Sequence, residues 1–407
     1  MSYKHVLIFG PNGGVSLSTG GGVNFVMKMA KSLLDLGVDS VTLAAYHSFS
    51  LRELEELNDI HLDPSRIRLI STNAVSSFDL FMMLPFKLSA YNFMLLKRFH
   101  EWVRRTIDRS EPDLIIFNDD IPTSAKDYLR NKNVILYAHN PIYTLEKNYI
   151  PILSESIGIP EYLNYEILNH IRTFPVIRNP EEYCDRILVN STVTKRVMES
   201  AGIKADLKIL YTYVETSRVH NELEKKNQFL SVGTFSRHKK YEVLIKAFTE
   251  FLKQNEDWKL VIAGYPRDTG YLRKLRKLRE QSENPQAISF KLNNSKDDLI
   301  LMMKESVSIV HSAPIEAFGL SPLEGMSFGD YPVVLNSEFS GLWTDVLERG
   351  KIGLGFQNET DLAKCMLEIT KSNRYAMKKE AVKQSMKFNQ ERFRDSLSEN
   401  VLENTNE

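Results

Sequence analysis

The sequence predicts an α/β protein with two doubly wound domains that face each other across a cleft. Short apolar runs alternate with helical patterns over the first 210 residues, and the alternation restarts after a polar stretch. The runs are apolar throughout, which is typical of parallel strands that are covered on both faces. The length of 407 residues fits two domains of roughly 100 to 200 residues each.

The first predicted domain covers residues 1–215. Its predicted strands are short and rich in β-branched residues, and each leads into a turn or a helical pattern. A predicted helix ends at Gly37. The predicted elements are strands at 5–10, 40–46, 112–118, 133–139 and 185–191, and a helix at 23–37.

A polar stretch without clear periodicity, residues 212–227, is predicted to link the domains. The second predicted domain covers 216–375, and a polar helical tail, 376–407, is predicted to cross back to the first domain. The second domain's predicted elements are strands at 229–235, 258–265, 287–292, 307–313 and 331–337, and helices at 241–255, 271–281, 296–305 and after Ser321. Open α/β sheets bind ligands at the carboxyl ends of their strands, which predicts a site in the cleft.

The composition excludes several classes of protein. Lys+Arg and Asp+Glu both number 52, so nothing favours nucleic acid as a partner. Cys184 and Cys365 lie far apart, which excludes a disulfide framework or a CxxC metal site and suits a reducing cytoplasm. The first residues lack a signal-peptide pattern, and no run of about 18 apolar residues occurs. We therefore expect a cytoplasmic protein, with at most peripheral contact at the inner face of the membrane.

Two glutamates flank a glycine turn in the stretch 311–329. Ser321, Pro322 and Glu324 fit a capping box, with serine as N-cap and glutamate at the third helical position. A capping box explains Glu324 but leaves Glu316 unexplained. Both glutamates follow the strand at 307–313, where the sheet rule places ligands, and the following helix N-terminus favours a phosphate.

These residues resemble the donor-site motif of a known family. The pattern S-x-x-x-E-x-F-G-L-x-x-x-E followed by G-x-x-P-V-V resembles that of the retaining GT-B glycosyltransferases, glycosyltransferase family four or group 1, which include many mannosyl-, glucosyl- and N-acetylglucosaminyltransferases. The likeness covers nearly the whole chain, through similar stretches at 18–37, 187–203, 229–248 and 258–265. It implies two Rossmann-like domains in the GT-B arrangement.

The resemblance assigns roles to the motif residues. Glu316 would contact the transferred sugar, and Glu324 would bind the ribose hydroxyls of the nucleotide. The backbone amides around Gly319 and Leu320 would hold sugar hydroxyls or the diphosphate, and Lys239 matches the family's diphosphate lysine. A carboxylate that accepts two hydroxyls makes a geometrically strict contact, and a cation at the departing phosphate stabilises its charge.

The resemblance also covers the first domain. This chain departs from the family pattern at two places: the arginine after Val232-Gly233 is missing, and one extra residue lies between Gly329 and Pro332, where the family usually has G-x-P-V-V. Gly21 and Gly22 would let the backbone close over the diphosphate, and His139 stands where the family keeps a residue near the anomeric carbon. The family's usual V-G-R reads here with Thr234 in place of the arginine. Arg237, three residues on, is the candidate replacement for the missing charge.

The resemblance implies transfer of a hexose-type sugar, with retention, from a nucleotide-diphosphate-sugar to a glycan or lipid-linked acceptor. No covalent nucleophile is evident, so we expect the acceptor hydroxyl to attack on the leaving-group side and a β-phosphate oxygen to take its proton. No metal and no cofactor are expected. The adjacent Asp119 and Asp120 follow a strand and suit a loop or helix cap better than a metal site.

Residues 78–105 allow two interpretations. They are rich in methionine and phenylalanine and include Lys87, Lys97, Arg98, Arg104 and Arg105. One interpretation is a core helix with a basic edge. The other is an interfacial patch that contacts a membrane weakly and reaches a lipid-linked acceptor.

Related folds also serve other functions. The sequence argues against a nicotinamide dehydrogenase because no G-x-G-x-x-G follows the first strand and no acidic residue ends the next. A nucleotide-sugar epimerase, a phosphorylase or a catalytically silent partner subunit stays open, and Thr234 in place of arginine favours the silent subunit.

Overall fold

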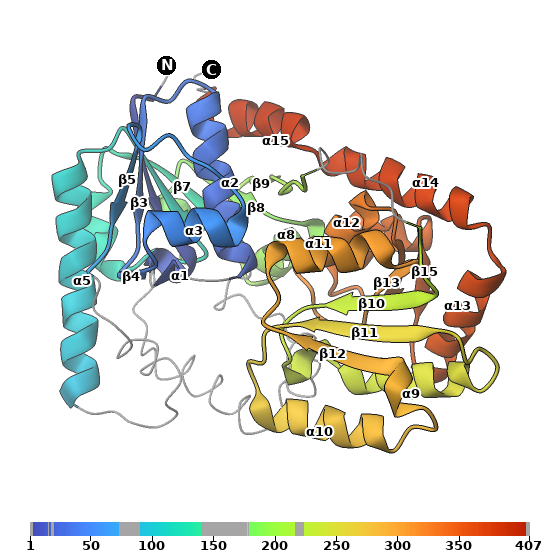
Figure 1. The fold of residues 1–407 in the computed structure, drawn as a ribbon. Coiled ribbons are helices and arrows are strands. Elements are labelled where there is room, and N and C mark those ends of the chain that lie inside the picture. The colour runs from blue at the N-terminus through green and yellow to red at the C-terminus, as the bar shows by residue number, and fades with distance from the viewer. Residues whose placement is uncertain are drawn as a thin grey trace.

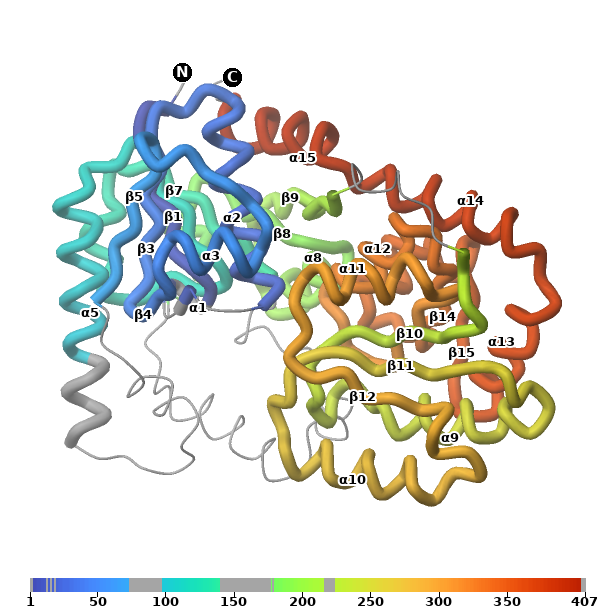
Figure 2. Tube along the Cα trace, viewed as in Figure 1, coloured from blue at the N-terminus to red at the C-terminus, as the bar shows by residue number. Residues whose placement is uncertain are grey.

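The computed structural model describes residues 3–14, 16–17, 20–72, 90–139, 177, 179–215 and 224–403, with side chains in the α5 helix from residue 97 onward. Two parallel sheets, each with helices around it, form the two domains (Figures 1 and 2). No helix in these ranges is long and apolar enough to cross a membrane.

The first sheet has seven parallel strands in the order β5-β3-β1-β6-β7-β8-β9. The strands are β1 (His5–Phe9), β3 (Ser40–Ala44), β5 (Ile67–Ile70), β6 (Leu114–Asn118), β7 (Asn133–Ala138), β8 (Arg186–Val189) and β9 (Leu207–Ile209). Alternate residues enter different cores: Val6 and Ile8 pack on one face, and Leu7 and Phe9 on the other. The uniformly apolar strands therefore reflect burial on both faces, as the sequence predicts.

Helices cover both faces of this sheet. They are α1 (Pro11–Gly14), α2 (Gly21–Asp35), α3 (Leu51–Asn58), α5 (Ala90–Ser110) and α8 (Thr192–Ser200), and a two-stranded ladder joins β2 (Ser16–Leu17) to β4 (His47–Ser48). The buried face of α2 includes Phe25, whose ring stacks on Tyr137 of β7 at 3.9 Å between centroids. This stacking fixes α2 over the centre of the sheet.

The second sheet has six parallel strands in the order β12-β11-β10-β13-β14-β15. The strands are β10 (Gln228–Val232), β11 (Lys259–Gly264), β12 (Ile288–Leu292), β13 (Ser308–His311), β14 (Tyr331–Leu335) and β15 (Leu354–Phe356). Its helices are α9 (Tyr241–Leu252), α10 (Thr269–Glu280), α11 (Lys296–Glu305), α12 (Leu320–Ser327), α13 (Glu359–Lys371) and α14 (Arg374–Ser385). The sequence therefore predicts the fold class correctly.

Strand order in the second sheet defines where a ligand belongs. Counted along the chain, the order is 3-2-1-4-5-6, which reverses direction between β10 and β13. Crossovers leave these two neighbouring strands on opposite faces, and this strand order predicts a ligand-binding crevice at their carboxyl ends. The segments that follow β10 and β13 contain Lys239 and Glu316.

The chain ends on the first domain. Helix α14 packs on α12 and β14 of the second domain, so the crossing lies at 386–389, some residues after the start of the predicted tail. Helix α15 (Gln390–Leu397) packs on α2, and Phe393 enters the core with Phe25. Figure 1 shows α15 beside α2, near both termini.

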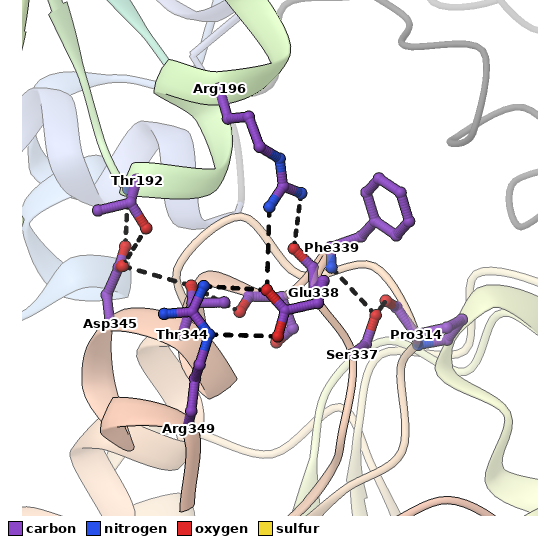
Figure 3. Close-up of polar contacts among 10 residues, drawn as sticks. Thr192, Arg196, Pro314, Ser337, Glu338, Phe339, Thr344, Asp345 and Arg349 are labelled. Atoms are coloured by element: carbon purple, nitrogen blue, oxygen red, sulfur yellow. Dashed lines mark hydrogen bonds and ion pairs between the residues drawn. The ribbon is translucent and has the colours of Figure 1, made fainter.

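Direct contacts join the domains near α8. The Asp345 carboxylate accepts hydrogen bonds from the backbone N–H of Thr192, at 2.8 Å, and from the Thr192 hydroxyl (Figure 3). Arg196 donates to the Glu338 carbonyl at 2.8 Å, and Arg349 holds the Glu338 carboxylate at 2.9 Å. The segment 338–349 is thus an interdomain contact.

Candidate active site

Lys239 is brought to the crevice by a tight turn after β10. Gly233 follows the last residue of β10, and a Cβ at Gly264, the end of β11, would lie 1.9 Å from the Gly233 carbonyl oxygen. Only a glycine with φ near 152° allows the two strand ends to approach this closely. A 3₁₀ turn over Arg237–Lys239 then follows, and the Ser312 hydroxyl donates to the Lys239 carbonyl at 2.6 Å.

Glu316 lies against Lys239. Lys239 Nζ donates to Glu316 Oε2 at 2.8 Å, and His311 Nε2 lies 3.1 Å from the same oxygen. The side chains of Lys239 and Glu316 are 15% and 20% exposed, so the pair is largely shielded from water but open on one side. The lone loop glutamate of the sequence is therefore a member of a buried charged cluster.

The ionisation of Glu316 and of His311 is set by burial and by their charged neighbours. Burial alone would raise the pKa of Glu316, but the Lys239 ammonium and His311 outweigh it and hold this pKa well below its usual range. Burial, together with the Lys239 charge, lowers the pKa of His311, so its ring is neutral near pH 7. Glu316 is thus an ionised hydrogen-bond acceptor.

The backbone of Glu316 is fixed by a short parallel bridge to Ser340. The Glu316 N–H donates to the Phe339 carbonyl at 3.2 Å, and the Gly341 N–H donates to the Glu316 carbonyl at 2.7 Å. A Cβ at Gly341 would lie 2.2 Å from the Ala317 carbonyl oxygen, so the two segments touch through backbone alone. Glu316 is therefore held by the segment that contacts the first domain.

The helix after the glycine turn begins at a different residue from the one that the sequence predicts. Helix α12 begins at Leu320, and its N-cap is Gly319 in the left-handed region at φ 92°. Ser321 is already inside the helix and caps nothing, so the predicted capping box is wrong. Glu324 lies in the second turn of α12, beyond reach of the N-cap. The first-turn amides of α12 nevertheless face the helix N-terminus, where an anion is stabilised.

Glu324 has a charged partner instead of a capping role. Lys296, the first residue of α11, donates to Glu324 Oε1 at 2.6 Å. Glu324 and Lys296 line a hollow that also includes Asn24 and Lys28 of α2, so both domains contribute to it. Lys28 is buried and donates to the Tyr213 carbonyl at 2.5 Å. Burial lowers the pKa of Lys28 to about 8, although Glu324 opposes this change.

The glycine loop of the first domain reaches the second. A Cβ at Gly21 would lie 3.4 Å from the Leu320 side chain, so this residue meets the start of α12 across the cleft. Gly22 packs against Pro11 within its own domain. The structure therefore brings Gly21 together with Leu320, the first residue of α12.

Two predicted site residues make their contacts elsewhere. The buried His139 ring packs between Phe25 and Tyr137, and its Nε2 has no hydrogen-bond partner among the described residues. Burial lowers the pKa of His139, so the ring is neutral. Arg237 is half exposed and pairs with Asp268 at 3.4 Å, and it has no contact with the Glu316 cluster in the described part of the chain.

Sequence reasoning missed His311, Lys296 and Lys28. His311 ends its strand before a turn, as His139 does, and the same signal identifies it. Nothing in the sequence marks Lys28 as buried, since it stands within an ordinary amphipathic helix. Within the described ranges, no group of three or more His, Cys, Asp or Glu residues could hold a metal ion.

Part of the predicted patch at 78–105 lies outside the described residues, which resume with α5 at Ala90. From residue 97 the helix shows both predicted features. Phe99, Val103 and Ile107 are buried in the core, and Arg105 is exposed. The described part is therefore a core helix with a basic edge.

Known proteins resemble this chain at low identity. Residues 214–386 match the family model described as glycosyl transferases group 1. The alpha-1,3/1,6-mannosyltransferase ALG2 of Saccharomyces cerevisiae is 26% identical over 194 residues, covering 38% of this chain and 39% of ALG2. The mouse GDP-Man:Man(3)GlcNAc(2)-PP-Dol alpha-1,2-mannosyltransferase is 25% identical over 228 residues, which cover 51% of this chain and 46% of the mouse protein. The match thus spans less than half of either relative.

Solved structures match over nearly the full length. Anabaena HepE, crystallised with UDP and glucose, has a TM-score of 0.64 at 13% identity and covers 98% of this chain and 99% of its own. WaaG, a glycosyltransferase involved in lipopolysaccharide biosynthesis, has a TM-score of 0.66 at 12% identity with the same coverage. Residues 214–386 therefore resemble the group 1 glycosyl transferases, and the whole chain shares the two-domain fold of these solved structures.

Proposed function

We propose that this protein transfers a hexose-type sugar, with retention, from a nucleotide-diphosphate-sugar to a glycan or lipid-linked acceptor. The observation that carries the proposal is the Lys239–Glu316–His311 cluster at the topological switch point of the second sheet. A donor bound there meets a cation, an ionised carboxylate and a helix N-terminus in one crevice. These three groups suit a diphosphate and a sugar.

Each group has a defined task in this proposal. The leaving diphosphate gains negative charge as the glycosidic bond breaks, and Lys239 and the first-turn amides of α12 stabilise that charge. Glu316, kept ionised by its neighbours, accepts hydrogen bonds from sugar hydroxyls and stabilises the cationic character of the sugar. Glu324 exchanges its Lys296 contact for the ribose hydroxyls. The acceptor hydroxyl attacks from the leaving-group side and gives its proton to a phosphate oxygen.

Glu316→Gln tests the proposal because it keeps the size of the side chain and removes its charge. We expect normal folding and a loss of transfer of about two orders of magnitude or more, since a transition-state contact disappears. Glu305→Gln is the matched control: this glutamate is also ion-paired in the second domain, with Lys226 at 2.5 Å, but precedes β13 instead of following it. Near-normal turnover by Glu316→Gln contradicts the proposal.

The donor panel follows from the relatives. Mannosyltransferase names among the curated relatives make GDP-mannose the first donor to test. UDP-glucose is the second, because a structure of HepE contains it. A donor at 100 times its dissociation constant is expected to stabilise the fold by about 2.7 kcal/mol, which thermal unfolding detects without knowledge of the acceptor.

One observation favours a second candidate, a silent partner subunit that binds the donor without turnover. Thr234 replaces the family's arginine, and Arg237 pairs with Asp268 instead of joining the cluster. Donor stabilisation without transfer to any acceptor supports this candidate. Turnover with phosphate alone, or without any acceptor, identifies a phosphorylase or an epimerase.

A further inference from the structure

A groove in the first domain, separate from the Glu316 cluster, is lined by arginines. It lies between helix α5 and the edge strand β5 and has a volume of about 400 Å³. Figure 1 shows α5 running along this edge of the sheet. Arg98, Arg105 and Arg109 are spaced by seven and four residues, so they share one face of α5. Arg68 reaches the groove from β5.

The groove carries a strong local excess of positive charge. Its lining includes four arginines and a single acidic residue, Glu101. Glu101 lies 3.8 Å from Arg105, a weak and exposed pair. Arg68, Arg98 and Arg109 form no ion pair among the described residues. The whole chain has a net charge of zero, so this concentration is a feature of the groove and not of the composition.

Ordinary surface chemistry accounts for only part of this arrangement. Arg109 lies in the last turn of α5, where a cation is favoured by the helix dipole. That reason does not apply to Arg98 and Arg105, which lie further from the helix end, and Arg105 and Arg109 repel each other across one turn. Arg68 belongs to another element and still converges on the same space. Four cations that converge with one weakly paired carboxylate, Glu101, as the only acidic lining residue among those described indicate an anionic ligand.

The lining indicates the type of anion. Guanidinium groups form paired hydrogen bonds with phosphate oxygens, and their fixed geometry favours phosphate over a simple point charge. Trp102 also lines the groove, and its Nε1–H is buried without an acceptor among the described residues. A surplus of three positive charges over Glu101 exceeds what one monovalent anion balances.

We propose that Arg68, Arg98, Arg105 and Arg109 form a binding site for a phosphate-bearing group with two or more negative charges. The source is either a phospholipid headgroup or a soluble phosphate compound. The site shares no lining residue with the Glu316 cluster, and its binding is measured without a sugar donor. Its failure and a failure of the proposed transfer activity are therefore distinguishable.

A pair of double variants tests the site. Arg98→Glu/Arg105→Glu reverses two charges in the groove, whereas Lys97→Glu/Arg104→Glu makes the same change in net charge at the neighbouring positions on α5 and leaves the groove intact. Arg98→Gln/Arg105→Gln provides a milder change, and circular dichroism with thermal unfolding checks that all three fold. The soluble probe is inorganic pyrophosphate, followed by calorimetry. The membrane probe is phosphatidylcholine vesicles with phosphatidic acid, compared with pure phosphatidylcholine.

We expect wild type to bind at least one probe, and the groove variant to lose about tenfold or more of that affinity, a change of 1.4 kcal/mol or more. The affinity of the control variant for the same probe is expected to stay within about twofold of the wild-type affinity. Binding of pyrophosphate alone identifies a soluble ligand, and binding of the acidic vesicles alone identifies a headgroup. Wild type that binds neither probe, or equal losses in groove and control variants, overturns the proposal. Pyrophosphate bound at the donor site remains in every variant as a separate binding event, so the affinity compared is that of the event which the groove substitutions weaken.

Discussion

Replacing Lys239 by methionine removes the cation that balances Glu316. The two charged atoms lie 2.8 Å apart, and an effective dielectric constant near 20 gives a gross attraction of about 6 kcal/mol. Desolvation of the lysine offsets much of this attraction. Removing one partner of a buried pair typically costs about 3–5 kcal/mol, and the one-fifth exposure of Glu316 places the expected loss near the lower value.

Denaturant unfolding of three proteins measures this loss: wild type, Lys239→Met and Lys239→Met/Glu316→Gln. The single variant is expected to lose about 3 kcal/mol, and the double variant to recover all but about 1 kcal/mol, because no buried charge is left unpaired. If the proposed function holds, neither variant is expected to transfer sugar. A single variant as stable as wild type, or a double variant no more stable than the single, refutes the reasoning.

The pH dependence gives an independent check on the same pair. In the wild type the pKa of Glu316 is lowered, so its stabilising contribution is present above pH 4.5 and is lost as the pH falls. In Lys239→Met the charge that outweighs burial is gone, and we expect burial to raise this pKa. Because the folded protein then holds the Glu316 proton more tightly than the unfolded chain does, the free energy of unfolding falls as the pH rises. The difference in the free energy of unfolding between wild type and Lys239→Met, measured by denaturant unfolding, should therefore widen from pH 5 to pH 8.

Three further outcomes are expected. Glu324→Gln should weaken nucleoside diphosphate binding by about tenfold in calorimetry, since the proposed carboxylate acceptor for the ribose hydroxyls is replaced by an amide, while Glu305→Gln is expected to bind normally. Gly319→Ala should destabilise the fold by about 1–3 kcal/mol in denaturant unfolding, because φ is 92° and the new methyl group would lie 2.8 Å from Leu342; an unchanged midpoint contradicts this. In the proposed mechanism Lys239 and the α12 amides balance the diphosphate, so transfer should survive EDTA; a complete loss restored by Mn²⁺ contradicts metal independence.

Local sequence patterns predict the layout of the fold because strands that are buried on both faces consist of uniformly apolar runs. The same patterns fail at the start of α12, where two helix-start signals compete. Ser321-Pro322 is a strong local signal, yet Gly319 in the left-handed region starts the helix earlier. The Leu342 side chain packs against Gly319, leaving no space for a Cβ there. That contact joins residues 23 positions apart, and no local pattern reports it.

In the candidate site, too, some features follow from sequence and topology, and others depend on long-range contacts. Glu316 and Lys239 follow strands that are adjacent at the switch point, so their proximity follows from topology once the strand order is known. His311 lies in an apolar strand, and only the sheet geometry shows that its ring faces Glu316. The position of Lys28 depends on how the two domains meet, which no property of α2 alone determines.

The position of Glu316 and the contact between the domains depend on one segment. Ser340 pairs with Glu316, and two residues away Glu338 accepts from Arg196 of the first domain. Further along, Asp345 receives both hydrogen bonds from Thr192 at the start of α8. Because the carboxylate cluster is fixed through this backbone, a separation of the domains that breaks the α8 contacts loosens the support of Glu316. A donor that bridges Gly21 and the Glu316 cluster would stabilise the same closed arrangement, so donor binding and site geometry are thermodynamically linked.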